Sequence, residues 1–234
     1  MWQHWFPKVR RHIKKALLTS AAAVNEHLHV TQKSCWGLAL PLHHVGGFGV
    51  AARAYEAGSG FQHFTQRWDA KQFHEWLDHY QITHTSLVPT QVYDLVKANR
   101  IAPKSIQSIV VGGGLLEISI GQAARDLGWP VLASYGMAEA ASQIATQPLD
   151  LLEKPYQPAP ISILPIWEIR ITPQQTLEIA GPALFSGYVI DGEFISRGTS
   201  WHTTSDFVQL DGQMISPLGR QDALVKILGE LVDP

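Results

Sequence analysis

Apolar positions in the first 147 residues follow two alternating spacings, one typical of helices and the other of buried strands. In 70–80, Phe73, Trp76 and Leu77 share one face of a predicted amphipathic helix. Helical patterns also cover 16–29, 90–98 and 118–127, and short strand-like apolar runs cover 36–41, 85–89, 106–111 and 130–134. Alternation at these lengths predicts right-handed βαβ units and a mainly parallel sheet flanked by helices.

The pattern changes after Gln147, where a cluster of prolines between residues 148 and 165 marks a boundary loop. Short alternating runs broken by turn residues follow, at 167–171, 176–180, 194–195, 207–210 and 213–215. The Asp211-Gly212 pair between the last two runs predicts a hairpin. The expected fold class is therefore α/β, with a mainly parallel sheet and flanking helices in residues 1–147. A small antiparallel, barrel-like subdomain is expected in residues 148–222.

The composition and charge of the chain exclude some classes of function. Hydrophobic residues make up 45% of the sequence and charged residues 16%, which is typical of a chain with a buried core. The formal net charge of −2 gives no electrostatic case for a nucleic-acid partner. No segment approaches the ~20 apolar residues of a membrane-spanning helix, so no membrane partner is expected.

The single cysteine and the first residues bear on the location of the protein. Cys35 permits no disulfide within the chain, which is typical of a reducing compartment. The first residues do not match a signal peptide, so we expect a cytoplasmic location. A basic cluster that includes Lys8, Arg10 and Lys14 is either a phosphate-attracting patch or a solvated helix face.

Two glycine-rich segments stand where a predicted strand ends. In LPLHHVGG, at 40–47, a helix begins at the glycines, and its bared N-terminus could receive a carboxylate or phosphate. Gly112, Gly113 and Gly114 directly follow the strand predicted for 106–111. Ligands of open α/β sheets bind at such strand ends, and glycines let a flat ring or a phosphate approach the backbone.

Two further segments carry aromatic and charged side chains. SYGMAE, at 134–139, follows the strand-like run 130–134 and places Tyr135 and Glu139 near another strand end. TTSD, at 203–206, is followed after one hairpin by GRQD, at 219–222. The Asp206 carboxylate could accept hydrogen bonds from both hydroxyls of a ribose, and Arg220 could hold a ribose oxygen or a phosphate.

Each of these segments, taken alone, has a simpler structural interpretation. Glycines more often form a tight turn, and Glu139 is in the first place an acid favoured by a helix N-terminus. Asp206 alone reads as a turn or cap residue and Arg220 as part of a surface ion pair. His43 and His44 invite a metal site, but the other histidines show no compact ligand spacing with them, which disfavours zinc.

The four segments together, in this order, resemble the adenylate-forming superfamily of acyl-CoA ligases, luciferases and peptide-synthetase adenylation domains. LVPTQ at 87–91 and GPALFSGY at 181–188 also resemble superfamily segments, so the resemblance covers nearly the whole chain. Within the superfamily, VPTQ, the glycine triplet and SQI at 142–144 are closest to the o-succinylbenzoate–CoA ligases of menaquinone synthesis.

The resemblance implies an ATP-dependent acid–thiol ligase that forms an acyl-adenylate and then an acyl-CoA thioester. Its substrate would be a small aromatic carboxylic acid, with ATP/AMP, Mg²⁺ and CoA as cofactors. The nucleotide-binding residues that it implies are Gly112, Gly113, Gly114, Tyr135, Gly136, Ala138, Asp206 and Arg220. The catalytic residues that it implies are His44, in the acyl pocket, Glu139, which would also hold Mg²⁺, and Lys8, at the end of the phosphate loop.

The chain departs from the family pattern in several places. The sequence before Phe6-Pro7-Lys8 is not the glycine-rich phosphate loop, and Ala138 stands where a hydroxyl residue is expected. Ser205 replaces the usual glycine of the TTSD segment. Asp222 matches the hinge of the family, and residues 223–234 are expected to complete the hinge and form a shortened start of the C-terminal domain, so the family's catalytic lysine has no counterpart.

Two hypotheses follow. The chain is either a divergent ligase that acts on o-succinylbenzoate or a similar aromatic acid, or a non-catalytic nucleotide- or acyl-binding remnant of that family. The missing loop and lysine favour the remnant on mechanistic grounds, whereas the resemblance favours the ligase, which is the function that we expect. For this chain alone we expect weak AMP binding and very slow thioester formation or none. The oligomeric state stays open, with a homodimer among the options.

Overall fold

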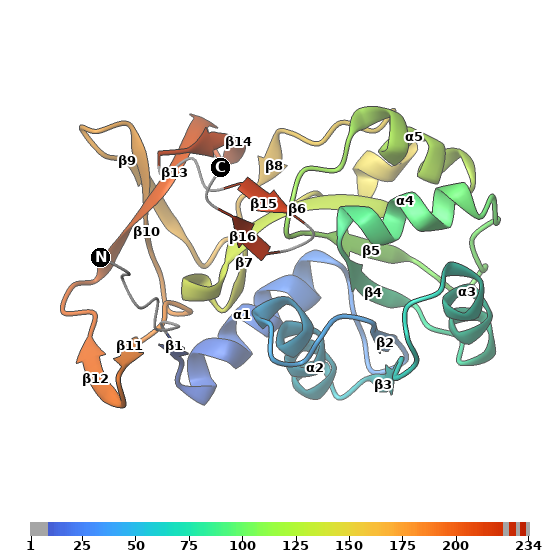
Figure 1. The fold of residues 1–234 in the computed structure, drawn as a ribbon, viewed down its shortest axis with the longest axis horizontal. Coiled ribbons are helices and arrows are strands. Elements are labelled where there is room, and N and C mark those ends of the chain that lie inside the picture. The colour runs from blue at the N-terminus through green and yellow to red at the C-terminus, as the bar shows by residue number, and fades with distance from the viewer. Residues whose placement is uncertain (1–8, 222–224, 228–229, 233–234) are drawn as a thin grey trace.

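The computed structural model describes residues 9–221, 225–227 and 230–232, and its largest element is a six-stranded sheet with helices on both faces (Figure 1). The strand order is β3-β2-β4-β5-β6-β7, and all neighbours are parallel except β6 and β7. The strands are β2 (Cys35–Leu38), β3 (Gly60–His63), β4 (His84–Leu87), β5 (Ser108–Val111), β6 (Val131–Met137) and β7 (Ser142–Thr146).

In the described part of the chain, five α-helices cover this sheet in two groups, because its central strands are apolar on both faces. They are α1 (Lys14–His27), α2 (Val45–Ala57), α3 (Ala70–His79), α4 (Pro89–Lys97) and α5 (Ile118–Asp126). Val110 of β5 faces the core under α1 and α2, whereas its neighbours Ile109 and Val111 face the core under α3, α4 and α5. The strand period of two therefore divides one apolar run between two cores.

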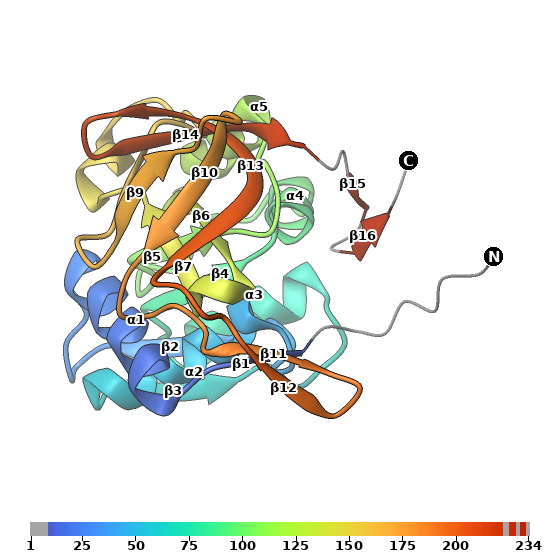
Figure 2. The same cartoon turned by 90° about the vertical axis from the view of Figure 1, so that its left-hand side faces the viewer.

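The second part of the chain forms antiparallel sheets (Figure 2). The five-stranded sheet has the order β8-β14-β13-β10-β9, and a three-stranded sheet has the order β1-β11-β12. Their strands are β8 (Ile161–Ser162), β9 (Glu168–Ile171), β10 (Thr176–Ala180), β13 (Trp201–Asp211) and β14 (Met214–Arg220), with β1 (Val9–Arg11), β11 (Gly187–Ile190) and β12 (Glu193–Ser196). β15 (Val225–Ile227) and β16 (Glu230–Val232) pair with each other.

One core joins the five-stranded sheet to the parallel one. Buried Leu177, Ile179 and Ile215 of the antiparallel strands belong to the same apolar cluster as Leu132 and Ile144 of β6 and β7. The short 3₁₀ turns η1 (Ala138–Ala140) and η2 (Leu149–Glu153) lie in the connection. The boundary predicted near residue 147 stays a prediction, because apolar packing runs across it.

The predicted fold class is confirmed, and so is the hairpin at Asp211-Gly212, where Asp211 faces Met214 across β13 and β14. The described antiparallel strands form open sheets rather than a closed barrel, so the barrel-like description was loose. The strand expected over 36–41 ends at Leu38, and Pro41, which has no N–H to donate to a sheet, lies in the turn before α2. Within the described residues, no helix is both long enough and apolar enough to cross a membrane.

Tyr156, in the connection after β7, packs against α5. Its side chain is 1% exposed, and its backbone N–H donates to Gln122 Oε1 at 2.8 Å. A Cβ atom added to Gly121 of α5 would lie 2.2 Å from Tyr156 Cδ1, well inside van der Waals contact. The tyrosine ring therefore packs directly on the helix backbone, which only glycine permits here.

We predict that Gly121→Ala lowers the free energy of unfolding by about 1–3 kcal/mol through this clash, although alanine favours a helix by up to about 1 kcal/mol. Urea denaturation measures the change. Gly46→Ala in α2 is the matched control, because its added Cβ would lie 3.5 Å from Leu40 Cδ1. Equal stabilities of the two variants would contradict this packing, and Tyr156→Leu added to Gly121→Ala is expected to recover part of the loss.

Candidate functional site

The glycine triplet forms the turn that leaves β5. Gly112 donates its N–H to the carbonyl of Leu87 at the end of β4, at 3.1 Å, and Gly113 has a φ of 80°, a conformation that side chains disfavour. Ser134 of β6 donates its hydroxyl to the carbonyl of Val111 at 2.9 Å. These contacts place the predicted nucleotide-binding glycines at the carboxyl edge of three neighbouring strands, β4, β5 and β6.

Tyr135, Asp206 and Arg220 meet although they come from distant parts of the sequence. The Tyr135 hydroxyl, on β6, donates to Asp206 Oδ2, on β13. Arg220 lies opposite Asp206 in the β13–β14 register, with its Nη1 3.4 Å from Asp206 Oδ1. Asp206 is 8% exposed, so this carboxylate is largely shielded from water. The structure therefore brings together three of the residues that the resemblance assigns to the nucleotide.

The surroundings of Tyr135 keep its hydroxyl protonated. Burial, and then the charge of Asp206, raise the pKa of the Tyr135 hydroxyl well above its usual value. The tyrosine thus stays a hydrogen-bond donor at neutral pH, while Arg220 supplies the compensating charge. The Asp206 backbone N–H also donates to Thr204 Oγ1 at 3.1 Å, within β13.

Glu139, on η1, is held by residues of the β1–β11 pair. Its Oε1 accepts from Arg10 Nε at 2.9 Å and from the Tyr188 hydroxyl at 3.2 Å. Arg10 and Tyr188 are register partners across β1 and β11. Burial pushes the pKa of Glu139 up, but the charge and hydrogen bond of Arg10 outweigh it and hold this pKa below its ordinary value. Glu139 is therefore an ionised, partnered carboxylate beside Ala138, whose carbonyl lies 2.7 Å from His12 Nε2.

The histidine motif lies at the start of α2. His44 precedes the first residue of the helix, with an extended φ of −90°, and both His43 and His44 are exposed. A Cβ added to Gly47 would lie 2.2 Å from the carbonyl oxygen of Pro41, so the close approach of turn and helix requires glycine. Among the described residues, no group of three or more histidine, cysteine and acidic side chains could hold a metal.

Arg53 was not predicted as a functional residue, although it is the one cation among small apolar residues in 45–57. Its guanidinium, 2% exposed, donates to Ser86 Oγ of β4 at 3.1 Å and to Ser142 Oγ of β7 at 3.2 Å. It also stacks over the Trp36 ring at 5.3 Å. Burial lowers the pKa of Arg53 to about 10, and no carboxylate of the described residues forms an ion pair with it.

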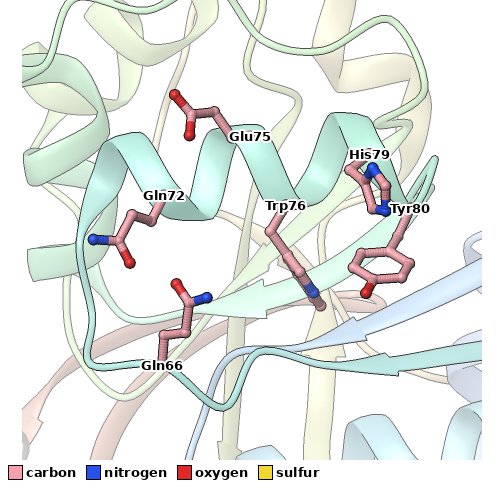
Figure 3. A pocket seen from close by; sticks show the side chains of 6 residues that line it. All are labelled: Gln66, Gln72, Glu75, Trp76, His79 and Tyr80. Atoms are coloured by element: carbon pink, nitrogen blue, oxygen red, sulfur yellow. The ribbon is translucent and has the colours of Figure 1, made fainter.

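Some predicted residues are not placed in this group. Lys8 and the hinge residue Asp222 lie outside the described residues. The resemblance, together with the strand-end rule, predicts that Gly113, Tyr135, Glu139, Asp206 and Arg220 line one cleft, and this convergence stays a prediction. A hollow of about 560 Å³ lies beside α3, and none of the predicted site residues lines it (Figure 3). It is lined by Gln66, Gln72, Glu75, Trp76, His79 and Tyr80.

Comparison with known proteins finds a matching family model and relatives that align with most of this chain. The model of the AMP-binding enzyme family matches residues 7–193. The 2-succinylbenzoate–CoA ligase of Escherichia coli (strain K12) is 29% identical over 230 residues, which cover 97% of this chain and 48% of the relative. The ligase of the same name from Geobacillus kaustophilus is 30% identical over 227 residues, which cover 91% of this chain and 46% of the relative. The chain thus spans about half the length of the curated relatives it matches.

Solved structures agree with the sequence relatives. O-succinylbenzoate coenzyme A synthetase (MenE) from Bacillus subtilis, in complex with ATP and magnesium ion, superposes with a TM-score of 0.80 at 25% identity. The alignment covers 97% of this chain and 50% of that one. Wild-type Escherichia coli MenE with a bound analogue of OSB-AMS gives a TM-score of 0.80 at 27% identity, over 97% of this chain and 49% of that one. The described fold, the order of the motifs and the match over residues 7–193 together show that the chain belongs to the AMP-binding enzyme family.

Proposed function

We propose that this chain is the nucleotide- and acyl-binding part of an ATP-dependent acid–thiol ligase that acts on o-succinylbenzoate or a similar aromatic dicarboxylic acid. The observation that carries this proposal is the meeting of Tyr135, Asp206 and Arg220 beside the glycine turn after β5. The similarity to ligases that are named for this substrate supports it.

In this proposal, the nucleotide binds at the carboxyl ends of β5 and β6. The adenine lies against Gly112, Gly113 and Gly114, where no side chain blocks the backbone, and Tyr135 packs on the base. Asp206 accepts hydrogen bonds from the ribose hydroxyls, and Arg220 stays beside it. A carboxylate is well suited to this role because each of its two oxygens accepts more than one hydrogen bond.

The phosphates would extend toward Glu139. A hard oxygen ligand of this kind fits Mg²⁺, which usually takes one or two carboxylates and completes its shell with phosphate oxygens and water. Bound there, Mg²⁺ would neutralise charge on the phosphates. At Oε1, the metal would have to take the place of Arg10. The same metal accompanies ATP in the Bacillus subtilis structure named above.

The proposed reaction has two displacements. In the first, a carboxylate oxygen of the acid attacks the α-phosphorus of ATP, the bond to the bridging oxygen breaks, and pyrophosphate leaves. In the second, the sulfur of CoA attacks the acyl carbon, the thiol proton is lost to solvent, and AMP leaves. The residues of this chain contribute by binding and orienting the adenylate, which makes both attacks intramolecular in effect. A Bacillus subtilis relative has been solved with the acyl-adenylate OSB-AMP.

Arg53 supports a substrate with a second carboxylate. A buried guanidinium that has only hydroxyl and aromatic partners retains an uncompensated charge, which costs free energy unless an anion arrives. Only one carboxylate of o-succinylbenzoate reacts, so the other is available to pair with a cation. We propose that Arg53, whose Nη2 would lie 3.2 Å from a Cβ added to Gly49 of α2, recognises that second carboxylate.

A non-catalytic adenylate-binding protein is the second candidate. Ala138 provides no hydroxyl for a phosphate, and Glu139 is already paired with Arg10. Release of pyrophosphate from ATP that depends on o-succinylbenzoate, and that Asp206→Ala abolishes, would support the ligase. Binding of AMP without any such release would support the second candidate.

We predict that Asp206→Ala weakens AMP binding by about 10- to 100-fold, since hydrogen bonds to a charged group contribute about 1.5–3 kcal/mol. Isothermal titration with AMP measures this loss. The variant should also lose any preference for AMP over its 2′,3′-dideoxy analogue, which has no ribose hydroxyls. Glu178→Ala is the matched control, because Glu178 is a carboxylate of the same sheet that pairs with Arg170 at 2.6 Å. Unchanged AMP affinity in Asp206→Ala would overturn the nucleotide site.

We predict that Arg53→Met abolishes the preference for o-succinylbenzoate over benzoate, a loss of at least about tenfold for a charge-assisted pair. The free energy of unfolding should fall by less than about 1 kcal/mol or should rise, because an apolar side chain of similar length replaces a buried unpaired charge. Equilibrium dialysis of the two acids and urea denaturation measure these effects. Arg53→Lys, which keeps the charge, should retain part of the preference. Full selectivity in Arg53→Met would refute this role.

A further inference from the structure

We propose that Arg10 occupies the cation position at Glu139, so that Arg10 and a divalent metal compete for one carboxylate. This inference rests on the proposed function, in which Glu139 is the protein ligand of the metal. It assigns to Arg10 a role in setting how strongly the nucleotide site depends on a metal.

The contact between Arg10 and Glu139 is supported from several sides. Arg10 Nε lies 2.9 Å from Glu139 Oε1, and the Glu139 side chain is only 12% exposed. The pairing of β1 with β11 fixes the position of Arg10 opposite Tyr188, whose hydroxyl donates to the same oxygen at 3.2 Å. A metal ion that binds Oε1 would therefore have to replace the guanidinium of Arg10, a residue whose place in the strand is fixed by the β1–β11 pairing.

Arg10 is the charge that matters at this carboxylate. His202 is close enough for its charge to influence Glu139, and His12 lies beside the carbonyl of Ala138. Burial, however, lowers the pKa of both His12 and His202, so both rings are mainly neutral at pH 7. The arginine remains charged at any physiological pH. Within the described part of the chain, Arg10 is therefore the permanent cation that pairs with Glu139.

A second cation beside Arg10 would be unfavourable. Among the described residues, Glu139 belongs to no group of three or more histidine, cysteine and acidic side chains that could hold a metal together. A divalent ion that approaches Oε1 meets the positive guanidinium within a few ångströms, where two like charges in a partly buried site repel each other strongly. We therefore expect a metal bound at Oε1 to displace Arg10. Without metal, Arg10 neutralises Glu139 and leaves the site ready for a phosphate group.

The test measures binding of Mn²⁺ alone, as a paramagnetic substitute for Mg²⁺, by the electron paramagnetic resonance signal of free Mn²⁺. We expect Arg10→Met to bind Mn²⁺ at least about tenfold more tightly than the unaltered chain, and the gain to disappear in Arg10→Met with Glu139→Gln. Arg11→Met is the matched control. It removes the same charge from the same strand, but Arg11 packs over the Phe194 ring at 4.8 Å.

Two outcomes would overturn the proposal: equal Mn²⁺ affinities in Arg10→Met and Arg11→Met, or a gain that survives Glu139→Gln. Arg10→Gln, which keeps an amide donor at Glu139 without the charge, should show the same gain even if Arg10→Met loosens β1. Mn²⁺ should also raise the midpoint of thermal unfolding more for Arg10→Gln than for the unaltered chain. These experiments contain no nucleotide. Their result therefore tests the competition at Glu139 even if the chain does not bind AMP.

Discussion

The carboxylate of Asp206 is the interaction on which the arrangement of the site depends. It accepts the Tyr135 hydroxyl from the parallel sheet and pairs with Arg220 in the antiparallel sheet. A largely buried carboxylate must be compensated by hydrogen bonds and an opposite charge, since burial without them is costly. Because the partners come from two sheets, satisfying one charge also aligns β6 with β13 and β14. The glycine turn after β5, on the strand next to β6, then lies beside the paired sheets.

The remaining charges of the site follow the same principle. Glu139 is satisfied by Arg10 and Tyr188 from the β1–β11 pair, which attaches a third sheet to the end of β6. Each acid is held by an arginine and a tyrosine from different elements, so the site is stabilised as a network rather than by separate ion pairs. Arg53 differs because its partners are only hydroxyls and an aromatic ring. A buried charge in such surroundings adds little stability, which makes a functional role the better explanation for it.

The shared apolar core holds together the two sheets that carry this network. Ile144 and Leu132 of the parallel sheet pack in one cluster with Leu177 and Ile215 of the antiparallel one. This packing holds the two sheets in a fixed relation without any charge. The core thus restricts how the two sheets can lie, and the polar contacts of Asp206 then select one of these arrangements. Burial of apolar surface provides the driving force, and hydrogen bonds provide the specificity.

The sequence alone determined the elements whose pattern is local. The helical face of Phe73 and Leu77, the buried strand that ends at Val111 and the turn at Asp211-Gly212 all depend on spacing and backbone preference, which neighbouring residues set. It did not reveal β3 or β7, because β3 is an exposed edge strand without alternation and β7 buries polar residues such as Gln143 and Thr146. The motifs indicated which residues belong to a nucleotide site, since their order is a property of the chain. Only the tertiary structure decided that Tyr135 meets Asp206, that Arg10 meets Glu139 and that Arg53 is buried without an acid. These contacts join residues as far as 129 positions apart, and chain packing rather than local pattern determines which of them form.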